Sequence, residues 1–203
     1  MSLPDIILAS ASPRRAALLA QVGLPFRVLP SMLDEDDGWA ETLGKDHEGR
    51  ASRLALAKAQ DVAARVGAGL VIGADTIVVC DGIAYGKPRD ASEAREILTR
   101  LAGRTHQVVT AVAIVEAQTR RFEIGRSVTL VRMRSFESTE IAAYVATGEP
   151  LDKAGAYAIQ GRGALLVEGI EGEYSTVVGL PLPTLTRLLR GFGVDIWQTV
   201  RHS

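Results

Sequence analysis

The sequence has little of what marks a secreted or membrane-bound protein. Its 203 residues include one cysteine, Cys80, so no intrachain disulfide can form. No stretch approaches the roughly 18 consecutive apolar residues of a membrane span. The first ten residues, MSLPDIILAS, lack the basic start and the long apolar run of a signal peptide. We therefore expect a soluble, cytoplasmic protein that does not enter a membrane.

The chain also lacks an excess of charge of either sign. It has 23 lysines and arginines against 24 aspartates and glutamates, which gives a formal net charge of -1. A surface built for nucleic acid would be strongly basic, so no nucleic-acid partner is expected. A local pocket for a small charged substrate is compatible with this balance.

Several common site motifs are missing as well. The sequence has no G-x-x-x-x-G-K-[ST] phosphate loop and no G-x-G-x-x-G between a strand and a helix. Its three histidines are scattered without metal-ligand spacing, and no Ser-His-Asp or Cys-His arrangement can be argued. If the chain binds a nucleotide, the site is of another kind.

Apolar runs and turn signals predict alternating helices and strands. The early alternation, with antiparallel pairs in the middle, favours an α/β fold with a mixed sheet and flanking helices. Asp81-Gly82 is a strong hairpin signal between two of the strands. With no repeat and no linker, residues 1–203 are expected to form a single domain. Strands are predicted at 6–9, 26–29, 70–80, 83–85, 107–117 and 127–134, and helices at 13–22, 48–66, 92–101, 139–146 and 181–189.

The stretch Ser10-Ala11-Ser12-Pro13-Arg14-Arg15 is the first candidate site. Ser12 is a good N-cap and Pro13 suits the first helical position. A helix N-terminus attracts anions, and two arginines there are unfavourable unless something negative lies nearby. Ser10, Ser12, Arg14 and Arg15 therefore describe a phosphate-binding site. The plainer alternative is a well-capped helix with solvated arginines.

The second candidate is Asp75, in the middle of the apolar run 70–80. A buried ionised carboxylate needs a metal, a basic neighbour or exposure into a cleft. An ion pair that only stabilises the fold is the alternative. Lys58 and Lys87, taken alone, are typical of solvated surface lysines. The acidic residues 34–37 are typical of a solvated turn, although one could supply a carboxylate to magnesium.

These pieces occur together in the Maf family of nucleoside triphosphate pyrophosphatases, which the chain resembles from Ile6 to about Leu189. The matching stretches are LASASPRR, the Asp34-Glu35 pair, LALAKA, GADTIV, GKPRD, GRTHQVVTAV, YVATGEPLDKAGAYAIQG and YSTVVGLPL. The resemblance implies two lobes around a deep cleft, a molecule that is often dimeric, and cleavage between the α- and β-phosphates. It also implies a divalent cation, Mg²⁺ or Mn²⁺.

The resemblance gives roles to individual residues. Asp75 matches the proton acceptor of the family, and Lys58, Lys87 and Glu35 match residues that line the same cleft. Asp75 and Glu35 are the expected metal ligands. The family motifs place Arg14, Thr76 and Gln160 at the positions that distinguish subfamilies.

At those three positions the sequence resembles the branch that prefers dTTP and UTP. A glutamine such as Gln160 can offer one donor and one acceptor to the O4 and N3–H edge of uracil or thymine. The alternatives are a pyrophosphatase for 7-methyl-GTP or another modified nucleotide, and a nucleotide-binding regulator of septum formation. Pyrophosphate release from a nucleotide panel would separate them.

Overall fold

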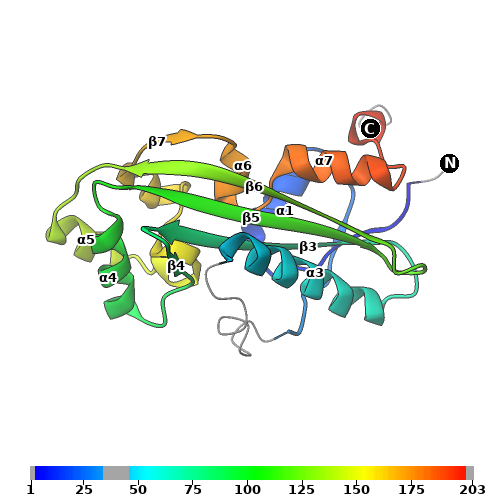
Figure 1. The fold of residues 1–203 in the computed structure, drawn as a ribbon, viewed down its shortest axis with the longest axis horizontal. Coiled ribbons are helices and arrows are strands. Elements are labelled where there is room, and N and C mark those ends of the chain that lie inside the picture. The colour runs from blue at the N-terminus through cyan, green and yellow to red at the C-terminus, as the bar shows by residue number, and fades with distance from the viewer. Residues whose placement is uncertain (1–2, 34–45, 200–203) are drawn as a thin grey trace. The chain divides into compact units, whose positions relative to one another are not determined.

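The computed structural model describes residues 3–33 and 46–199. Figure 1 shows the ribbon of the chain, coloured from the N-terminus to the C-terminus. The strands are β1 (Ile6–Leu8), β2 (Arg27–Val28), β3 (Leu70–Cys80), β4 (Ile83–Tyr85), β5 (Thr105–Glu116), β6 (Phe122–Met133) and β7 (Val167–Glu171). The helices are α1 (Pro13–Gln21), α3 (His47–Arg65), α4 (Ala91–Leu101), α5 (Ser138–Val145), α6 (Tyr174–Val178), α7 (Leu182–Gly191) and α8 (Ile196–Thr199), with the short 3-10 helices η1 (Glu149–Asp152), η2 (Ala154–Ala156) and η3 (Gly161–Leu166).

The seven strands form one sheet in the order β2-β1-β3-β5-β6-β7, with β4 paired to β3. β1 runs parallel to both β2 and β3, whereas β4 and β7 run antiparallel to their partners. A mixed sheet with flanking helices confirms the predicted α/β class. Among the described residues, no helix is long and apolar enough to cross a membrane.

The chain divides into two compact units, and β3, β5 and β6 each contribute residues to both. The first unit comprises residues 1–75, 110–127 and 179–203, and the second comprises residues 76–109 and 128–178.

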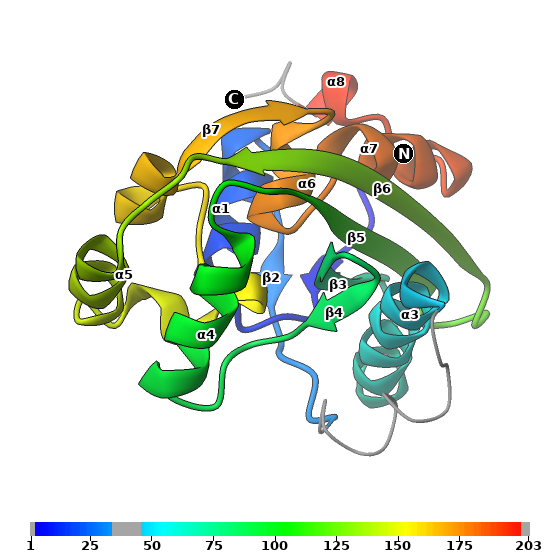
Figure 2. The same ribbon diagram turned by 60° about the vertical axis from the view of Figure 1, so that its left-hand side comes forward.

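In the first unit, helices pack on both faces of the strands. On β6, a Cβ at Gly125 would lie 2.5 Å from the Thr184 side chain of α7. The next residue, Arg126, points the other way and pairs with Glu48 of α3 at 2.5 Å. Side chains alternate along a strand, so α7 and α3 cover opposite faces, as Figure 2 also shows.

The second unit has its own core around α4 and α5. These two helices lie side by side in Figure 2. The core includes Leu98 and Leu101 of α4, Ile141 and Tyr144 of α5, and Met133 of β6, all 6% exposed or less. It also takes in Tyr157, from an irregular part of the chain.

The predicted element limits agree well with the observed ones. β3 begins and ends where expected, and Asp81 and Gly82 form the turn to β4 with φ of 50° and 75°. Among the predicted elements, the beginning of β6 differs most, since it starts at Phe122 and not at residue 127. Residues 122–128 are half-buried or exposed throughout. Because this part of the strand is not in the core, its sequence has no apolar run from which the strand could be predicted. β7, α6 and α8 were not predicted.

Candidate active site

Asp75 and Lys58 form a buried ion pair within the first unit. The Lys58 Nζ donates to Asp75 Oδ1 at 2.7 Å, and the two side chains are only 7% and 10% exposed. Lys58 is therefore the basic neighbour that an aspartate in an apolar strand requires. The interpretation of Lys58 as a solvated surface lysine is wrong, because its ammonium group lies against the sheet.

The glycine at position 73 explains why the two side chains meet. Gly73 precedes Asp75 by two residues, so both face the same side of β3. A Cβ at Gly73 would lie 2.2 Å from the Ala55 carbonyl oxygen and 2.8 Å from the Ala59 nitrogen, both in α3. Only a glycine allows the helix this close. The close approach brings Lys58, next to Ala59, within hydrogen-bonding reach of the carboxylate.

Ser10 organises the loop between β1 and α1. Its Oγ accepts hydrogen bonds from the Ser12 backbone N–H at 3.2 Å and from Arg15 Nη1 at 3.1 Å. Arg15 also donates from Nε to the Gly179 carbonyl oxygen at 2.7 Å. Ser12 does occupy the N-cap position, but its side chain makes no capping hydrogen bond. Two N–H groups of Arg15 thus engage protein acceptors, and this arginine holds Ser10 in place.

The Ser10 loop and Asp75 both follow the point where the pairing of β1 with β3 stops, which is the carboxyl end of β1 and the middle of β3. Leu8 is paired with Ile72, and the Ala9 N–H donates to the Ile72 carbonyl at 2.8 Å. Beyond this point β1 stops, while β3 continues to Cys80. Ser10 is the second residue after Leu8, and Asp75 is the third residue after Ile72. Ligands commonly bind at the carboxyl ends of such strands.

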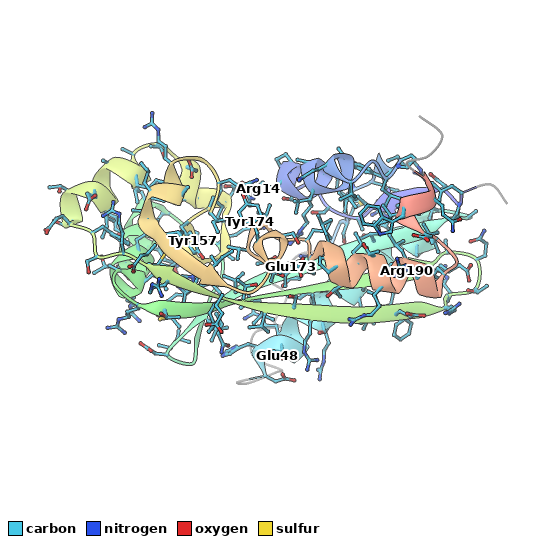
Figure 3. All side chains as sticks on the ribbon, turned by 90° about the horizontal axis from the view of Figure 1, so that it is seen from above. Arg14, Glu48, Tyr157, Glu173, Tyr174 and Arg190 are labelled. Atoms are coloured by element: carbon cyan, nitrogen blue, oxygen red, sulfur yellow. The ribbon has the colours of Figure 1, made fainter. Side chains whose placement is uncertain are left out.

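The start of α1 carries Arg14, another of the predicted substrate-binding residues. It is half-buried at the start of α1. In Figure 3 it lies on the opposite side of the strands from Glu48 of α3, whereas Asp75 points toward α3. A ligand that contacts both Arg14 and Asp75 would therefore have to lie across the end of β1.

The remaining predicted residues belong to the second unit or are not described. Thr76 follows Asp75 and points to the opposite face of β3. Lys87 is exposed and lines a groove of about 260 Å³ together with Glu93, Glu96 and Arg100. Gln160 is exposed. Glu35, the second expected metal ligand, lies outside the described residues.

A backbone contact connects the segments that carry Lys87 and Gln160. The Gly155 N–H donates to the Gly86 carbonyl at 3.0 Å, next to Lys87. Gly155 has φ of 72°, and a Cβ there would lie 2.7 Å from the side chain of Val78. Glycine is needed for both reasons. The two predicted substrate-binding segments of the second unit are thereby held together.

Two polar groups of the second unit could not be identified from the sequence pattern. One is the pair Tyr144 and Glu149, whose hydroxyl and carboxylate are 2.9 Å apart. The Glu149 carboxylate also accepts from the backbone N–H groups of Arg162 and Gly163. Burial acts to raise the pKa of Glu149, but these N–H groups and the Tyr144 hydroxyl outweigh it, so the pKa lies below its ordinary value. In the sequence, the glycines at 161 and 163 mark the place where the backbone passes close to Glu149 and Tyr144.

The other group is His106, which hydrogen-bonds Tyr157. Its Nε2 lies 2.8 Å from the Tyr157 hydroxyl, and the imidazole is 2% exposed. Its Nδ1 has no hydrogen-bond partner among the described residues. Burial lowers the pKa of His106 to about 4, so the ring is neutral at pH 7. Burial likewise raises the pKa of Tyr157, with a smaller contribution from Tyr144.

The described residues do not form a complete metal site by themselves. They are better suited to a cation that is held by the protein and the substrate together. No three histidine, cysteine, aspartate or glutamate side chains gather among them in a metal-binding group. Magnesium is commonly held by one or two carboxylates together with substrate phosphates. The carboxylate of Asp75 fits that arrangement.

Comparison with known proteins gives consistent matches over almost the whole chain. The family model described as "Maf-like protein" matches residues 5–192. A protein of Moorella thermoacetica named dTTP/UTP pyrophosphatase is 52% identical over 198 residues, covering 98% of this chain and all of that protein. A protein of the same name from Symbiobacterium thermophilum is 47% identical, covering 96% and 97% of the two chains. A third, from Gloeobacter violaceus, is 48% identical, covering 92% and 95%.

Proposed function

This chain belongs to the Maf family, and we propose that it hydrolyses dTTP and UTP to the nucleoside monophosphate and pyrophosphate. The names of its relatives support the substrate, and so do the predicted subfamily residues Arg14, Thr76 and Gln160. The observation that carries the chemistry is the buried pair of Asp75 and Lys58, beside the end of β1 where Ser10 and Arg15 lie.

The first task of the site is to bind a triphosphate with nearly four negative charges. The start of α1 offers backbone N–H groups and the positive end of the helix dipole. The Arg14 guanidinium can donate two hydrogen bonds to phosphate oxygens. Arg15, already bonded to Ser10 and Gly179, keeps the loop in shape and adds positive charge. The family resemblance adds Lys87, whose ammonium is exposed, to the proposed substrate-binding residues.

The second task is to deprotonate the attacking water. As the water oxygen bonds to the α-phosphorus, the bond from that phosphorus to the bridging oxygen breaks and pyrophosphate leaves. Asp75 accepts the proton that the water loses. Lys58 donates to Oδ1 and fixes the carboxylate, and a carboxylate has a second oxygen that can take the proton. No covalent intermediate is required.

Nucleotide pyrophosphatases of this family are generally metal-dependent. Asp75 is the described residue that would hold Mg²⁺ or Mn²⁺, with Glu35 as the second proposed ligand. A bound divalent cation would supply positive charge to the phosphate oxygens and stabilise the charge of the leaving group.

Base selection is assigned to the second unit. The Gln160 amide can donate to O4 and accept from N3–H of uracil or thymine, while cytosine presents the reverse pattern. A 7-methylguanine ring, which carries donors and a positive charge, would favour a glutamate at this position. The glutamine therefore supports a pyrimidine substrate.

Pyrophosphate release tests this proposal. The purified protein would be incubated with UTP, dTTP, CTP and 7-methyl-GTP in the presence of Mg²⁺, with and without a chelator. We expect release from UTP and dTTP well above that from CTP and 7-methyl-GTP, and loss of release on chelation. Tight binding of UTP without turnover would instead favour a nucleotide-binding regulator. Preferential turnover of 7-methyl-GTP would reassign the substrate.

A further inference from the structure

The residue assigned to the base lies in a part of the chain without regular structure. Gln160 is exposed between η2 and η3. Gly155, Ala156 and Gly161 around it all have positive φ, between 56° and 72°. For a non-glycine residue such as Ala156 this conformation is unfavourable and needs support from the surrounding structure. The position of Gln160 therefore depends on what holds the segment.

Two side chains hold residues 158–163 from both ends. The Tyr144 hydroxyl accepts a hydrogen bond from the Ala158 N–H at 3.2 Å and donates to Glu149 Oε1 at 2.9 Å. The Glu149 carboxylate accepts from the Arg162 N–H at 3.1 Å and from the Gly163 N–H at 3.0 Å. Ala158 lies two residues before Gln160, and Arg162 lies two residues after it. We call Tyr144 and Glu149 the 144–149 clamp.

The surroundings of the clamp are built to keep these bonds. Tyr144 is 6% exposed in the core of the second unit, so its ring cannot move freely. A Cβ at Gly161 would lie 2.9 Å from Glu149 Oε2, so the glycine makes room for the carboxylate. Hydrogen bonds from backbone N–H groups to a carboxylate are among the stronger ones in proteins.

We propose that the 144–149 clamp positions Gln160 so that the enzyme discriminates uracil and thymine from cytosine. This inference rests on the proposed function and goes beyond it, because neither Tyr144 nor Glu149 touches the base in this scheme. They are positioning residues for Gln160.

The chemical reason lies in the symmetry of an amide group. Turned by 180°, the Gln160 amide would present its acceptor where its donor was, which is the pattern that cytosine needs. Selectivity therefore requires that the groups around the amide satisfy only one of its two orientations, and that the amide stay beside those groups. A backbone fastened two residues before and two residues after the glutamine keeps the amide beside the same groups, and a loosened backbone would let the side chain turn and adapt to either base.

The test uses two conservative variants of the full chain and a matched control. Tyr144→Phe keeps the ring in the core but removes the hydrogen bonds of the hydroxyl with Ala158 and Glu149. Glu149→Gln keeps the size of the side chain but replaces one carboxylate oxygen by a donor. Glu140→Gln, also in the second unit, weakens an ion pair with Arg134 and the cap of α5 without touching residues 158–163. Kinetic constants for UTP and CTP would be measured for each, together with the melting temperature.

We expect Tyr144→Phe and Glu149→Gln to reduce the ratio of kcat/KM for UTP to that for CTP by roughly tenfold, as the loss of one or two hydrogen bonds permits. The change should come from a higher KM for UTP and a lower KM for CTP, with kcat for UTP much less affected. Glu140→Gln should keep the wild-type ratio. Hydrogen exchange at Ala158, Arg162 and Gly163 should accelerate only in the two clamp variants.

The outcomes separate this inference from the proposed function. If wild type prefers UTP and the clamp variants keep the same ratio, or lose UTP and CTP turnover equally, the clamp does not set base choice and the inference is overturned alone. If wild type does not hydrolyse UTP or dTTP, the proposed function fails and the inference fails with it. A change of ratio that Glu140→Gln reproduces would also overturn the inference, because it would reflect general destabilisation.

Discussion

The two units of this protein hold their proposed functional groups in different ways. In the first unit, Asp75 and Lys58 stand on a regular strand and a regular helix and bind each other directly, at 2.7 Å and nearly out of solvent. In the second unit, Gln160 is exposed on an irregular segment. It is held indirectly, through backbone N–H groups that donate to Tyr144 and Glu149.

This difference suggests a division of work. The charged pair that we propose for proton transfer is fixed by the packing of a helix on a sheet. The group that we propose for base selection is placed on a loop, where a few hydrogen bonds decide its position. Damage to the first arrangement should lower turnover for all nucleotides, and damage to the second should change which nucleotide is preferred.

The largest effect is expected for Asp75→Asn. The amide cannot accept the water proton, so kcat for UTP and dTTP should both fall by at least about a hundredfold. Nucleotide binding, measured by calorimetry, should persist. Asp61→Asn is the matched control, because Asp61 is also a hydrogen-bonded carboxylate of the first unit but bonds Ser31, Met32 and Arg65. A folded Asp75→Asn protein with near wild-type turnover would remove Asp75 from the mechanism.

The second prediction concerns stability. Lys58→Met leaves the Asp75 carboxylate buried without its partner, which should lower the free energy of unfolding by about 3–5 kcal/mol. Adding Asp75→Asn should recover much of that loss, because the uncompensated charge is gone. Urea denaturation of the two single variants and the double variant would measure the coupling.

The exposed pair of Arg132 and Glu168 is the control for the buried pair of Lys58 and Asp75. Both side chains are more than half exposed, and breaking the pair should cost no more than about 1 kcal/mol. If Lys58→Met were as mild as Arg132→Met, the interior pair would have to be far better solvated than its 7% and 10% exposure indicates.

Much of the first unit's arrangement could be predicted from the sequence, and the reason is local. β3 lies in an apolar run that begins after Gly69 and ends at Asp81-Gly82, so its limits follow from composition and turn chemistry. The need of Asp75 for a basic neighbour also follows from its place in that run. The identity of the neighbour does not, because the contact with Lys58 depends on how closely α3 packs at Gly73.

The second unit was less predictable for a related reason. Residues 149–166 have no regular period, so their conformation is set by hydrogen bonds between residues distant in sequence, such as Tyr144 to Ala158. The sequence identified Gln160 only through a family resemblance. It gave no sign that His106, one histidine in an apolar strand, would be buried against Tyr157.

The third prediction concerns the pH dependence of stability that the buried His106 of the second unit should cause. The folded pKa of His106 is about 4 and the unfolded value is about 6.5, so between these values only the unfolded state binds the proton. Stability should therefore fall as the pH drops from 6.5 to 4, by about 3 kcal/mol in total, and this contribution should level off below pH 4. His106→Gln should remove this part of the pH dependence.

Tyr157→Phe serves as the control for the third prediction. It deletes the hydrogen bond to the imidazole but leaves the ring buried, and burial is what lowers the pKa of His106. The fall in stability between pH 6.5 and 4 should thus persist in Tyr157→Phe. If Tyr157→Phe abolished it and His106→Gln did not, the assignment of the acid sensitivity to the buried imidazole would be wrong.

The smallest effect is expected for Ser10→Ala. This variant tests most directly whether the first unit affects all nucleotides equally. The change removes the oxygen that accepts from Ser12 and Arg15, which should cost about 1 kcal/mol in stability. Because the loop then holds the phosphates less well, KM should rise a few-fold, by the same factor for UTP, dTTP and CTP. Steady-state kinetics on all three nucleotides would check this. A change in base preference would contradict the division of work, since a residue that positions phosphate-binding groups has no means of sensing the edge of the base.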